Sequence, residues 1–308
     1  MLIFWNSLIL LGSIVALWLG AVWLVEASAR IAGRLGISEL VIGLTVVAFG
    51  TSAPEFAVTI SAALKGQTSI SVGNVVGSNI FNLGFILGGV ALIKAVTTTR
   101  KLVRRDGALL LASSGILLVF LYNLQINRWE GIILFAMLVA YIILLFVKKE
   151  APEEEIEIGE FHWFEIPRLL IGLAAIVAGG HFLVESATLI ARHFGVSEWV
   201  IGVTVVAAGT SAPEFATSLV AVVRGKHGIS AGNLIGSNIF NLLGVLGLAA
   251  MIRPMQIDSG AYMDVVLLTG VAAVAVLFMR TGWKISRFEA GLLITLNLIL
   301  WITIFMHK

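Results

Sequence analysis

The chain is dominated by apolar segments that are long enough to cross a lipid bilayer. Hydrophobic residues make up 59% of its 308 residues and charged residues only 12%, whereas a soluble domain carries about a quarter charged residues. A helix needs about 20 apolar residues to span the hydrocarbon core. The sequence therefore predicts an all-α membrane protein with ten transmembrane helices, at residues 3–29, 38–64, 70–93, 107–125, 129–147, 166–191, 197–223, 229–251, 260–280 and 288–306.

The distribution of basic residues predicts how the chain is oriented in the membrane. When the loops are assigned alternately to two sides, one side receives fifteen of the twenty Lys and Arg residues and the other receives five. Cytoplasmic loops carry the excess of Lys and Arg in membrane proteins. We therefore expect a multi-pass protein of the cell membrane with both termini extracellular. Its partners would be the lipid bilayer and small ions, with no nucleic acid and no obligate protein partner.

The second half of the sequence repeats the first at an offset of 159 residues. GISELVIGLTVVAFGTSAPEF at 36–56 matches GVSEWVIGVTVVAAGTSAPEF at 195–215 in 17 of 21 positions. A second pair follows in each half, GNVVGSNIFNLGFILG at 73–88 and GNLIGSNIFNLLGVLG at 232–247. Because each unit holds five predicted helices, the second unit would enter the membrane from the opposite face. Inverted repeats of this kind are typical of secondary transporters, which bind their substrate near the midplane between the repeats.

The repeat also predicts the domain boundaries. A first five-helix repeat would cover residues 1–147, with its motifs at 50–56 and 73–88, and a second would cover 166–308, with its motifs at 209–215 and 232–247. Residues 148–165 would form an acidic cytoplasmic linker. This segment lacks the spaced Asp, Asn and Gly residues of a calcium-binding loop, so we interpret it as a solvated connection.

The repeated GTSAPEF motif places a helix breaker and a carboxylate inside an apolar segment. Pro54 has no N–H and leaves the carbonyl of Gly50 without its helical partner, so the helix should open over about residues 48–51. Freed carbonyls at membrane depth are tolerated where they line a cavity or are buried in protein. Thr51 and Ser52 precede Glu55 by four and three residues, which places them on its helix face. The second copy repeats this arrangement with Ala207, Thr210, Ser211, Pro213 and Glu214.

Counting the oxygen atoms of both copies predicts the ion. Two bidentate carboxylates, Glu55 and Glu214, and the carbonyls of Thr51 and Thr210 provide six oxygens, within the six to eight that Ca²⁺ prefers. Mg²⁺ remains possible but gives up its water reluctantly. The chain has no Cys and no His in these motifs, which disfavours zinc and copper.

The second motif adds neutral oxygens beside the carboxylates. Ser78 and Asn82 are four residues apart, as are Ser237 and Asn241, so each pair shares a helix face. These hydroxyls and amides would suit a smaller monovalent charge, namely Na⁺. A single Ser, Thr or Gly in a membrane helix is most often a packing residue. The two glutamates differ, because an acidic side chain at the centre of a membrane helix costs about 2.5–3.5 kcal/mol and both occur at equivalent positions beside a proline.

The paired motifs resemble the two α-repeats of the cation/calcium exchanger superfamily, in particular its prokaryotic sodium/calcium exchanger branch. The resemblance covers the whole chain. It implies ten transmembrane helices in inverted five-helix repeats and Ca²⁺ export driven by Na⁺ entry. It also implies that Glu55 and Glu214 are the central Ca²⁺ carboxylates and that Thr51 and Thr210 offer carbonyls. The Na⁺ ligands would be Ala48, Ser52, Ser78, Ala207, Ser211 and Ser237.

The asparagines bear on which ions are coupled. By the resemblance, Asn82 and Asn241 would line the centre between the other ligands. Potassium-dependent relatives carry Asp where this chain has Asn241, which argues against K⁺ co-transport. Proton-coupled relatives usually carry a glutamate around the positions of Ser78 and Asn82, and its absence favours Na⁺.

These observations predict a secondary antiporter that exports Ca²⁺ in exchange for Na⁺ by alternating access. It would not be an enzyme and would use no cofactor, since Ca²⁺ and Na⁺ are its transported ions. A H⁺/Ca²⁺ antiporter is the nearest alternative, because Glu55 and Glu214 could carry the counter-proton. A cation channel is a more remote alternative, since inverted repeats with a shared carboxylate pair suit a carrier better.

Overall fold

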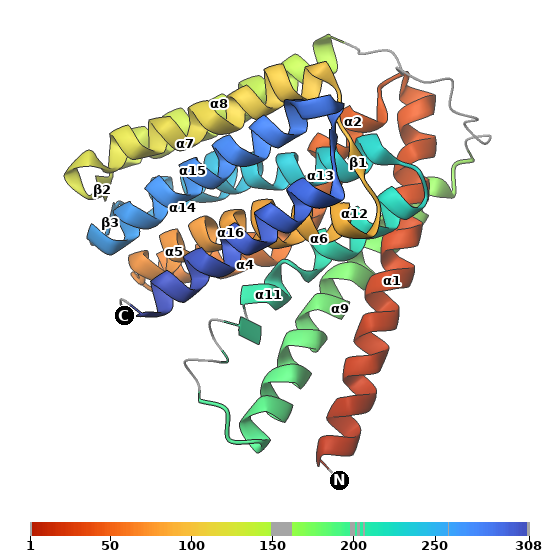
Figure 1. The fold of residues 1–308 in the computed structure, drawn as a ribbon, viewed down its shortest axis with the longest axis horizontal. Coiled ribbons are helices and arrows are strands. Elements are labelled where there is room, and N and C mark those ends of the chain that lie inside the picture. The colour runs from red at the N-terminus through yellow and green to blue at the C-terminus, as the bar shows by residue number, and fades with distance from the viewer. Residues whose placement is uncertain are drawn as a thin grey trace.

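The computed structural model describes residues 2–148, 162–197, 201, 204–205, 207–257 and 259–306. Most of the predicted linker, residues 149–161, lies outside the described residues. The described part is almost wholly helical (Figure 1), so the prediction of an all-α protein is confirmed. Among the described residues, seven helical stretches are long and apolar enough to cross a membrane, or eight if the bent segment 39–64 is one span. The count of ten spans stays a prediction.

The first half begins with a single long helix and continues with helices that are interrupted by short irregular turns. The π-helical turns are η1, η2 and η3, and η4 is a 3₁₀ turn. In chain order the elements are α1 (Leu2–Leu35), α2 (Glu39–Ile42), η1 (Gly43–Val47), α3 (Ala48–Thr51), α4 (Ala53–Leu64), α5 (Thr68–Phe81), η2 (Asn82–Ile86), α6 (Leu87–Ile93), β1 (Val96–Thr97), η3 (Leu102–Gly107), α7 (Ala108–Phe120), η4 (Leu121–Asn123), β2 (Gln125–Ile126) and α8 (Arg128–Val147).

The described elements of the second half follow a similar order, without a counterpart of η3. They are α9 (Glu165–His193), α11 (Ala207–Thr210), α12 (Ala212–Val223), α13 (His227–Ile239), π-helix η6 (Phe240–Val245), α14 (Leu246–Ile252), β3 (Met255–Gln256), α15 (Ser259–Arg280), 3₁₀ turn η7 (Thr281–Trp283), β4 (Lys284–Ile285) and α16 (Arg287–Met306). Helices α4 and α12, α6 and α14, and α8 and α16 begin and end at residues separated by the offset of 159. The sequence repeat is therefore also a repeat of secondary structure.

Two short strand pairs join the halves. Strand β1 pairs with β4 and β2 pairs with β3, both antiparallel. Each pair takes one strand from the first half and one from the second. The helices that follow β2 and β4 begin with the same kind of cap. Asn127 and Glu130 form a capping box at the start of α8, and Glu289 accepts hydrogen bonds from the backbone and side chain of Ser286 at the start of α16.

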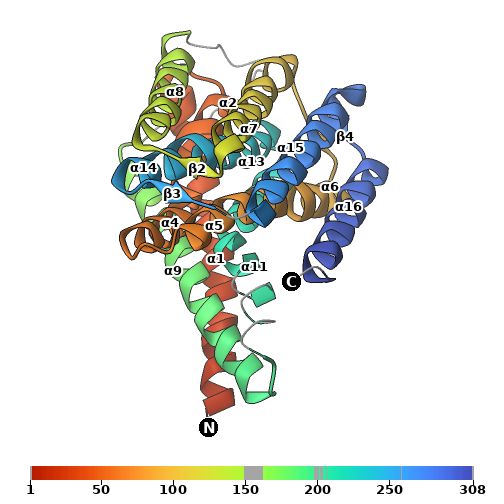
Figure 2. The same ribbon diagram turned by 90° about the vertical axis from the view of Figure 1, so that its left-hand side faces the viewer.

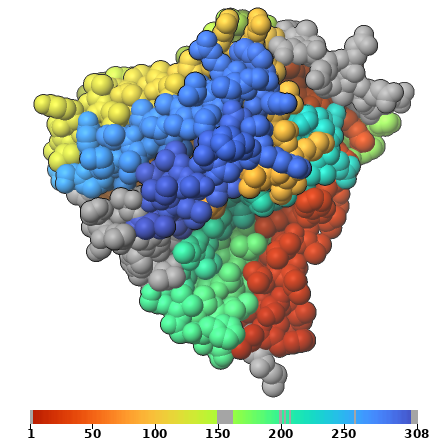
Figure 3. All heavy atoms as spheres, viewed as in Figure 1, coloured from red at the N-terminus to blue at the C-terminus, as the bar shows by residue number. Residues whose placement is uncertain are grey.

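Helices α1 and α9 lie side by side and project from the remaining helices (Figures 1 and 2). The space-filling view shows the same pair, in red and green, extending below the rest of the molecule (Figure 3). A close backbone approach explains the pairing: a Cβ added to Gly20 would lie 2.7 Å from the carbonyl oxygen of Gly172. Small residues allow such contact between membrane helices.

The centre of the molecule is formed by the helices of the repeated motifs. The most apolar window of the stretch His227–Ile252 is 83% buried, against 33% for α1 and for α9. Glycines again explain the close packing, because a Cβ on Gly232 would lie 2.8 Å from the carbonyl oxygen of Leu40, and one on Gly236 would lie 2.7 Å from the Cβ of Ala48. Helix α13 therefore packs directly against α2, η1 and α3.

The predicted opening of residues 48–51 is wrong by a few residues. Residues Ala48–Thr51 form the helical turn α3, and the interruption falls at Ser52, which has φ −79° and ψ 7°. The physical reason is that Pro54 removes only its own donor. The N–H groups before it still bond within the helix, as that of Ser52 does to the Ala48 carbonyl at 3.1 Å. The two parts of the segment, Glu39–Thr51 and Ala53–Leu64, are bent by 51°.

Candidate functional site

Each copy of the GTSAPEF motif places a glutamate in the first turn of a helix that starts at a break. In the first copy, Ser52 directly follows α3. Pro54 lies within the first two positions of α4, and Glu55 lies in the first turn of that helix. In the second copy, Ser211 has φ −90° and ψ 6°, and Glu214 lies in the first turn of α12. The N-terminus of a helix carries partial positive charge, which favours a carboxylate there.

Each glutamate accepts a hydrogen bond from the serine at the helix break of the other motif copy. Both carboxylates are fully buried, at 0% exposure. The Ser52 hydroxyl donates to Oε1 of Glu214 at 3.0 Å, and the Ser211 hydroxyl donates to Oε1 of Glu55 at 3.1 Å. These reciprocal bonds bring together side chains that are 159 residues apart in sequence. The serines therefore bind the carboxylate of the other copy, whereas the sequence had grouped each with the glutamate of its own copy.

Several buried oxygens beside these bonds lack a hydrogen-bond donor. Within the described part of the chain they include Oε2 of Glu55, Oε2 of Glu214 and Oδ1 of Asn241, and both polar atoms of the Asn82 side chain are also unpartnered. A buried polar group without a partner is costly. A cation bound between the carboxylates would satisfy the free oxygens and offset both negative charges.

The hydroxyls of the second motif lie at the same place. The Thr51 hydroxyl is 3.3 Å from the Ser237 hydroxyl. The helix break of the first motif copy therefore lies against α13 of the second half. The Asn241 amide donates to the Ser78 hydroxyl at 3.3 Å. The site is therefore built of carboxylate, hydroxyl and amide oxygens contributed by both halves.

The predicted Na⁺ ligands Ala48 and Ala207 and the predicted carbonyl ligand Thr210 lie in the short helical turns α3 and α11. The Ala48 carbonyl accepts from the Ser52 N–H at 3.1 Å and from the Thr51 hydroxyl at 3.3 Å, so it belongs to the helical turn α3. Thr210 ends α11 directly before Ser211. Ala207 begins α11, and only its backbone belongs to the described structure. The structure thus places these residues beside the breaks.

Two features of the site were not predicted from the sequence. Asn74 and Asn233 bond to the backbone carbonyls of Glu55 and Glu214, and their repetition at the offset of 159 was the available signal. The π-helical turns are the second feature. Turn η1 ends directly before Ala48, and η2 begins at Asn82. Such turns are frequent at functional sites, but no residue pattern in this sequence marks them.

The donor set suits a hard cation. In the residues that the structure describes, no three His, Cys, Asp or Glu side chains gather into a group that could hold a metal ion. Two carboxylates surrounded by neutral oxygens therefore supply the charge. Ca²⁺ takes oxygen ligands of this kind and tolerates irregular geometry.

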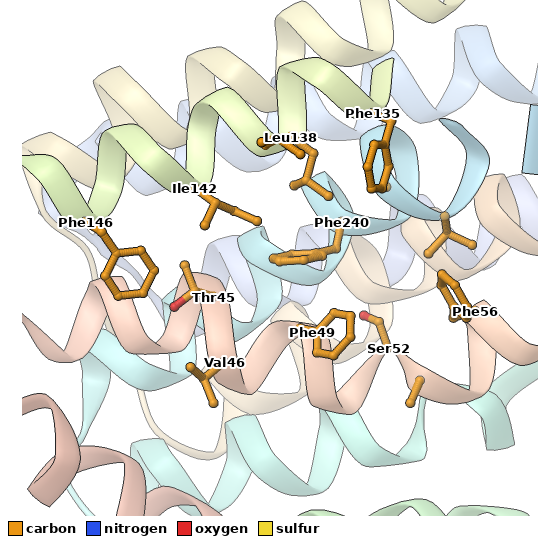
Figure 4. Close-up of a pocket in the computed structure, with 14 residues that line it drawn as sticks. Thr45, Val46, Phe49, Ser52, Phe56, Phe135, Leu138, Ile142, Phe146 and Phe240 are labelled. Atoms are coloured by element: carbon orange, nitrogen blue, oxygen red, sulfur yellow. The ribbon is translucent and has the colours of Figure 1, made fainter. Parts of the chain in front are cut away.

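An apolar cavity of about 410 Å³ lies next to the site. Figure 4 shows Phe135, Leu138 and Ile142 on one side of it, with Phe49 and Ser52 opposite. Its lining is almost entirely hydrocarbon and aromatic, with Thr45 and Ser52 as the polar residues. Ser52, which donates to Glu214, lines the cavity and so connects it to the site.

Comparisons with known proteins identify the family of the chain. The sequence profile described as sodium/calcium exchanger protein matches residues 5–147 and 165–306. The chain is 32% identical over 334 residues to sodium/calcium exchanger MaX1 of Methanosarcina acetivorans, covering 94% of this chain and 95% of that protein. It is 37% identical over 299 residues to inner membrane protein YrbG of Escherichia coli, covering 91% and 90%. A solved structure of the sodium-calcium exchanger NCX_Mj superposes with a TM-score of 0.85 at 30% identity, covering 96% of this chain and 98% of that one. The chain therefore belongs to the sodium/calcium exchanger protein family.

Proposed function

We propose that this protein is a secondary antiporter that exports Ca²⁺ in exchange for Na⁺ at a site shared by its two halves. Its family is that of cation/Ca²⁺ antiporters, and its relatives MaX1 and NCX_Mj are named as sodium/calcium exchangers. The observation that carries the proposal is the pair of reciprocal bonds, Ser52 to Glu214 and Ser211 to Glu55, around buried carboxylates with free oxygens.

Ca²⁺ would bind between Glu55 and Glu214. Their two charges balance that of the ion, and carbonyls of Thr51 and Thr210 would complete its oxygen shell. Na⁺ ions would bind around the same carboxylates, with Ser, Ala and Asn residues of both motifs as further ligands: Ala48, Ser52, Ser78, Asn82, Ala207, Ser211, Ser237 and Asn241. Because both loads need the carboxylates, they would exclude each other, and this competition would couple their fluxes.

Alternating access would follow from the arrangement of the halves. Residues 1–147 and 166–308 would be inverted repeats that place the carboxylates near the bilayer midplane. The long helices α1 and α9 bear none of the proposed ligands and pack mainly on each other. We assign them the role of the moving group, while the motif helices hold the site. The excess of basic loops would lie in the cytoplasm, with both termini outside the cell.

The test is uptake of ⁴⁵Ca²⁺ into proteoliposomes that contain the purified protein. Vesicles loaded with Na⁺ and diluted into Na⁺-free buffer should accumulate Ca²⁺, and Na⁺ ionophore should abolish the accumulation. Accumulation driven by a pH gradient without Na⁺ would identify a H⁺/Ca²⁺ antiporter instead. Equilibration of Ca²⁺ without accumulation under either gradient would indicate a channel.

A further inference from the structure

Two asparagines outside the proposed ligand set occupy equivalent places beside the carboxylates. Asn74 lies in α5 and Asn233 lies in α13. Asn233 is fully buried, and Asn74 is partly buried. Each bonds to the helix that carries a glutamate of its own half, and the two sets of contacts repeat each other.

In the first half, Asn74 connects α5 to α4 at the level of the carboxylate. Its Nδ2 donates to the Glu55 carbonyl at 3.3 Å and to the Thr59 hydroxyl at 2.9 Å. One turn away, the Ser71 hydroxyl donates to the Thr59 carbonyl at 3.0 Å. The backbone of Glu55 is therefore fixed to its neighbouring helix by a side chain that adds no charge.

In the second half, Asn233 makes the same connection between α13 and α12. Its Nδ2 donates to the Glu214 carbonyl at 3.4 Å and to the Ser218 hydroxyl at 2.9 Å. The Ser230 hydroxyl donates to the Ser218 carbonyl at 2.9 Å. In both halves of the chain, equivalent hydrogen bonds thus fix the backbone of the glutamate to the neighbouring helix.

Asn233 also reaches the other half of the site. Its Oδ1 accepts a hydrogen bond from the Thr51 hydroxyl at 3.0 Å. Thr51 lies next to the break at Ser52, and its hydroxyl contacts Ser237. One amide therefore fixes the helix of Glu214 with its nitrogen and the proposed carbonyl ligand of the first half with its oxygen.

We propose that Asn74 and Asn233 are positioning residues that set the spacing of the two carboxylates and so favour Ca²⁺ over Na⁺. This inference rests on the proposed function. Ca²⁺ must be bound by both carboxylates at once, so it depends on their separation. Each Na⁺ ion uses only part of the oxygen set and tolerates a looser arrangement. Cavity size and ligand rigidity are the properties by which oxygen sites select among hard cations.

The experiment compares Ca²⁺ and Na⁺ binding to the purified full-length protein by titration calorimetry, each ion alone. In Asn233→Ala, we expect Ca²⁺ affinity to fall about tenfold, because the hydroxyl of Thr51 and the groups on α12 lose a buried partner. Na⁺ affinity should change much less, so the ratio of the two affinities falls. In transport, the KM for Ca²⁺ should rise more than the maximal rate falls.

A matched pair of variants at Ser218 separates positioning from packing. Ser218→Ala removes one of the two acceptors of the Asn233 nitrogen and should lower the affinity ratio in the same direction. Ser218→Thr keeps the hydroxyl, as Thr59 does in the first half, and should retain the wild-type ratio. This pair decides the question even if Asn233→Ala does not fold.

Three results can be told apart. Unchanged Ca²⁺ affinity in Ser218→Ala and in any folded Asn233→Ala would overturn the positioning role. Equal weakening of both ions would also overturn it, since that result indicates general loosening of the site. A wild-type protein that binds no Ca²⁺ would instead contradict the proposed function itself.

Discussion

The α1–α9 pair and the helices around the candidate site differ in burial and in the contacts that hold them. The site helices exchange hydrogen bonds between the two halves, such as that from Ser52 to Glu214, and α13 with α14 is mostly buried. Only 33% of the most apolar window of each helix of the pair is buried, and the two helices meet along glycines, with Gly20 and Gly172 in close contact. Directional bonds fix the positions of the site helices relative to each other, whereas close glycine packing holds α1 and α9 together as a unit. The difference suits a rigid site beside a movable pair.

The pair is connected to the rest of the molecule by ion pairs near one end. Glu26 of α1 bonds to Arg168 of α9 and to Arg224, which follows α12. Arg30 of α1 bonds to Glu165 of α9. These contacts join the two members of the pair to each other and to a site helix. Both partners of the two Glu26 pairs are partly exposed, so each of these pairs is expected to contribute little to stability and could be exchanged during movement. Glu165, in contrast, is fully buried.

The largest effect is expected from removing a carboxylate of the rigid region. Glu55→Gln and Glu214→Gln keep the side-chain shape but remove one of the two charges that oppose Ca²⁺. Each should reduce Ca²⁺ transport by about a hundredfold or more, the scale seen when a buried charge loses its partner. The measurement is ⁴⁵Ca²⁺ uptake, with Glu185→Gln on exposed α9 as the control. Near-normal exchange in either variant would exclude the shared carboxylate centre.

Competition between ions should be the next largest effect. At constant ionic strength, saturating Na⁺ should weaken Ca²⁺ binding by about tenfold or more, equivalent to about 1.4 kcal/mol. Protons should act in the same direction, because protonation of either glutamate removes a ligand charge. Equilibrium ⁴⁵Ca²⁺ binding, with Na⁺ replaced by a large organic cation, measures both effects. Ca²⁺ affinity that is insensitive to Na⁺ but sensitive to pH would favour proton coupling.

A smaller effect should follow from disturbing the movable pair. Gly20→Ala places a Cβ 2.7 Å from the Gly172 carbonyl oxygen, and overpacking of this kind costs about 1–3 kcal/mol. Transport should slow several-fold, while equilibrium Ca²⁺ binding stays close to that of the wild type. Gly12→Ala on the same helix is the control, because its Cβ would have no neighbour within 4 Å. If Gly20→Ala weakened binding as much as transport, the pair would not be separable from the site.

The smallest effect is expected at the ion pairs. Glu26→Gln removes the carboxylate that bonds to Arg168 and Arg224, and partly exposed pairs contribute about 0–1 kcal/mol. We expect up to a few-fold change in transport rate with unchanged Ca²⁺ affinity. The matched control is Glu185→Gln, its counterpart in the repeat, whose side chain is 57% exposed and lies 3.9 Å from His181. Equal effects of the two substitutions would show that these ion pairs have no special role.

Much of the candidate site could be predicted because its determinants are local. A proline within a helix interrupts it in any protein, so Pro54 and Pro213 predict a break. Glu55 and Glu214 are acidic residues within apolar segments, which marks them as candidate ligands. The offset of 159 residues then indicated that the two motifs act together. The break lies at Ser52 and not over residues 48–51 as predicted, because the helical hydrogen bonds before the proline persist. The number of membrane spans and the sense of the repeats remain predictions.

The sequence by itself determined the all-helical membrane character, the repeat and the chemical types of the proposed ligands, because hydropathy, periodicity and residue type are local properties. Only the tertiary structure decided which oxygens meet. Ser52 faces Glu214, Ser211 faces Glu55, and Asn233 receives the hydroxyl of Thr51. These contacts depend on how the two halves pack against each other. That packing is set by glycine contacts and buried side chains of both halves together, which no single segment of the sequence contains.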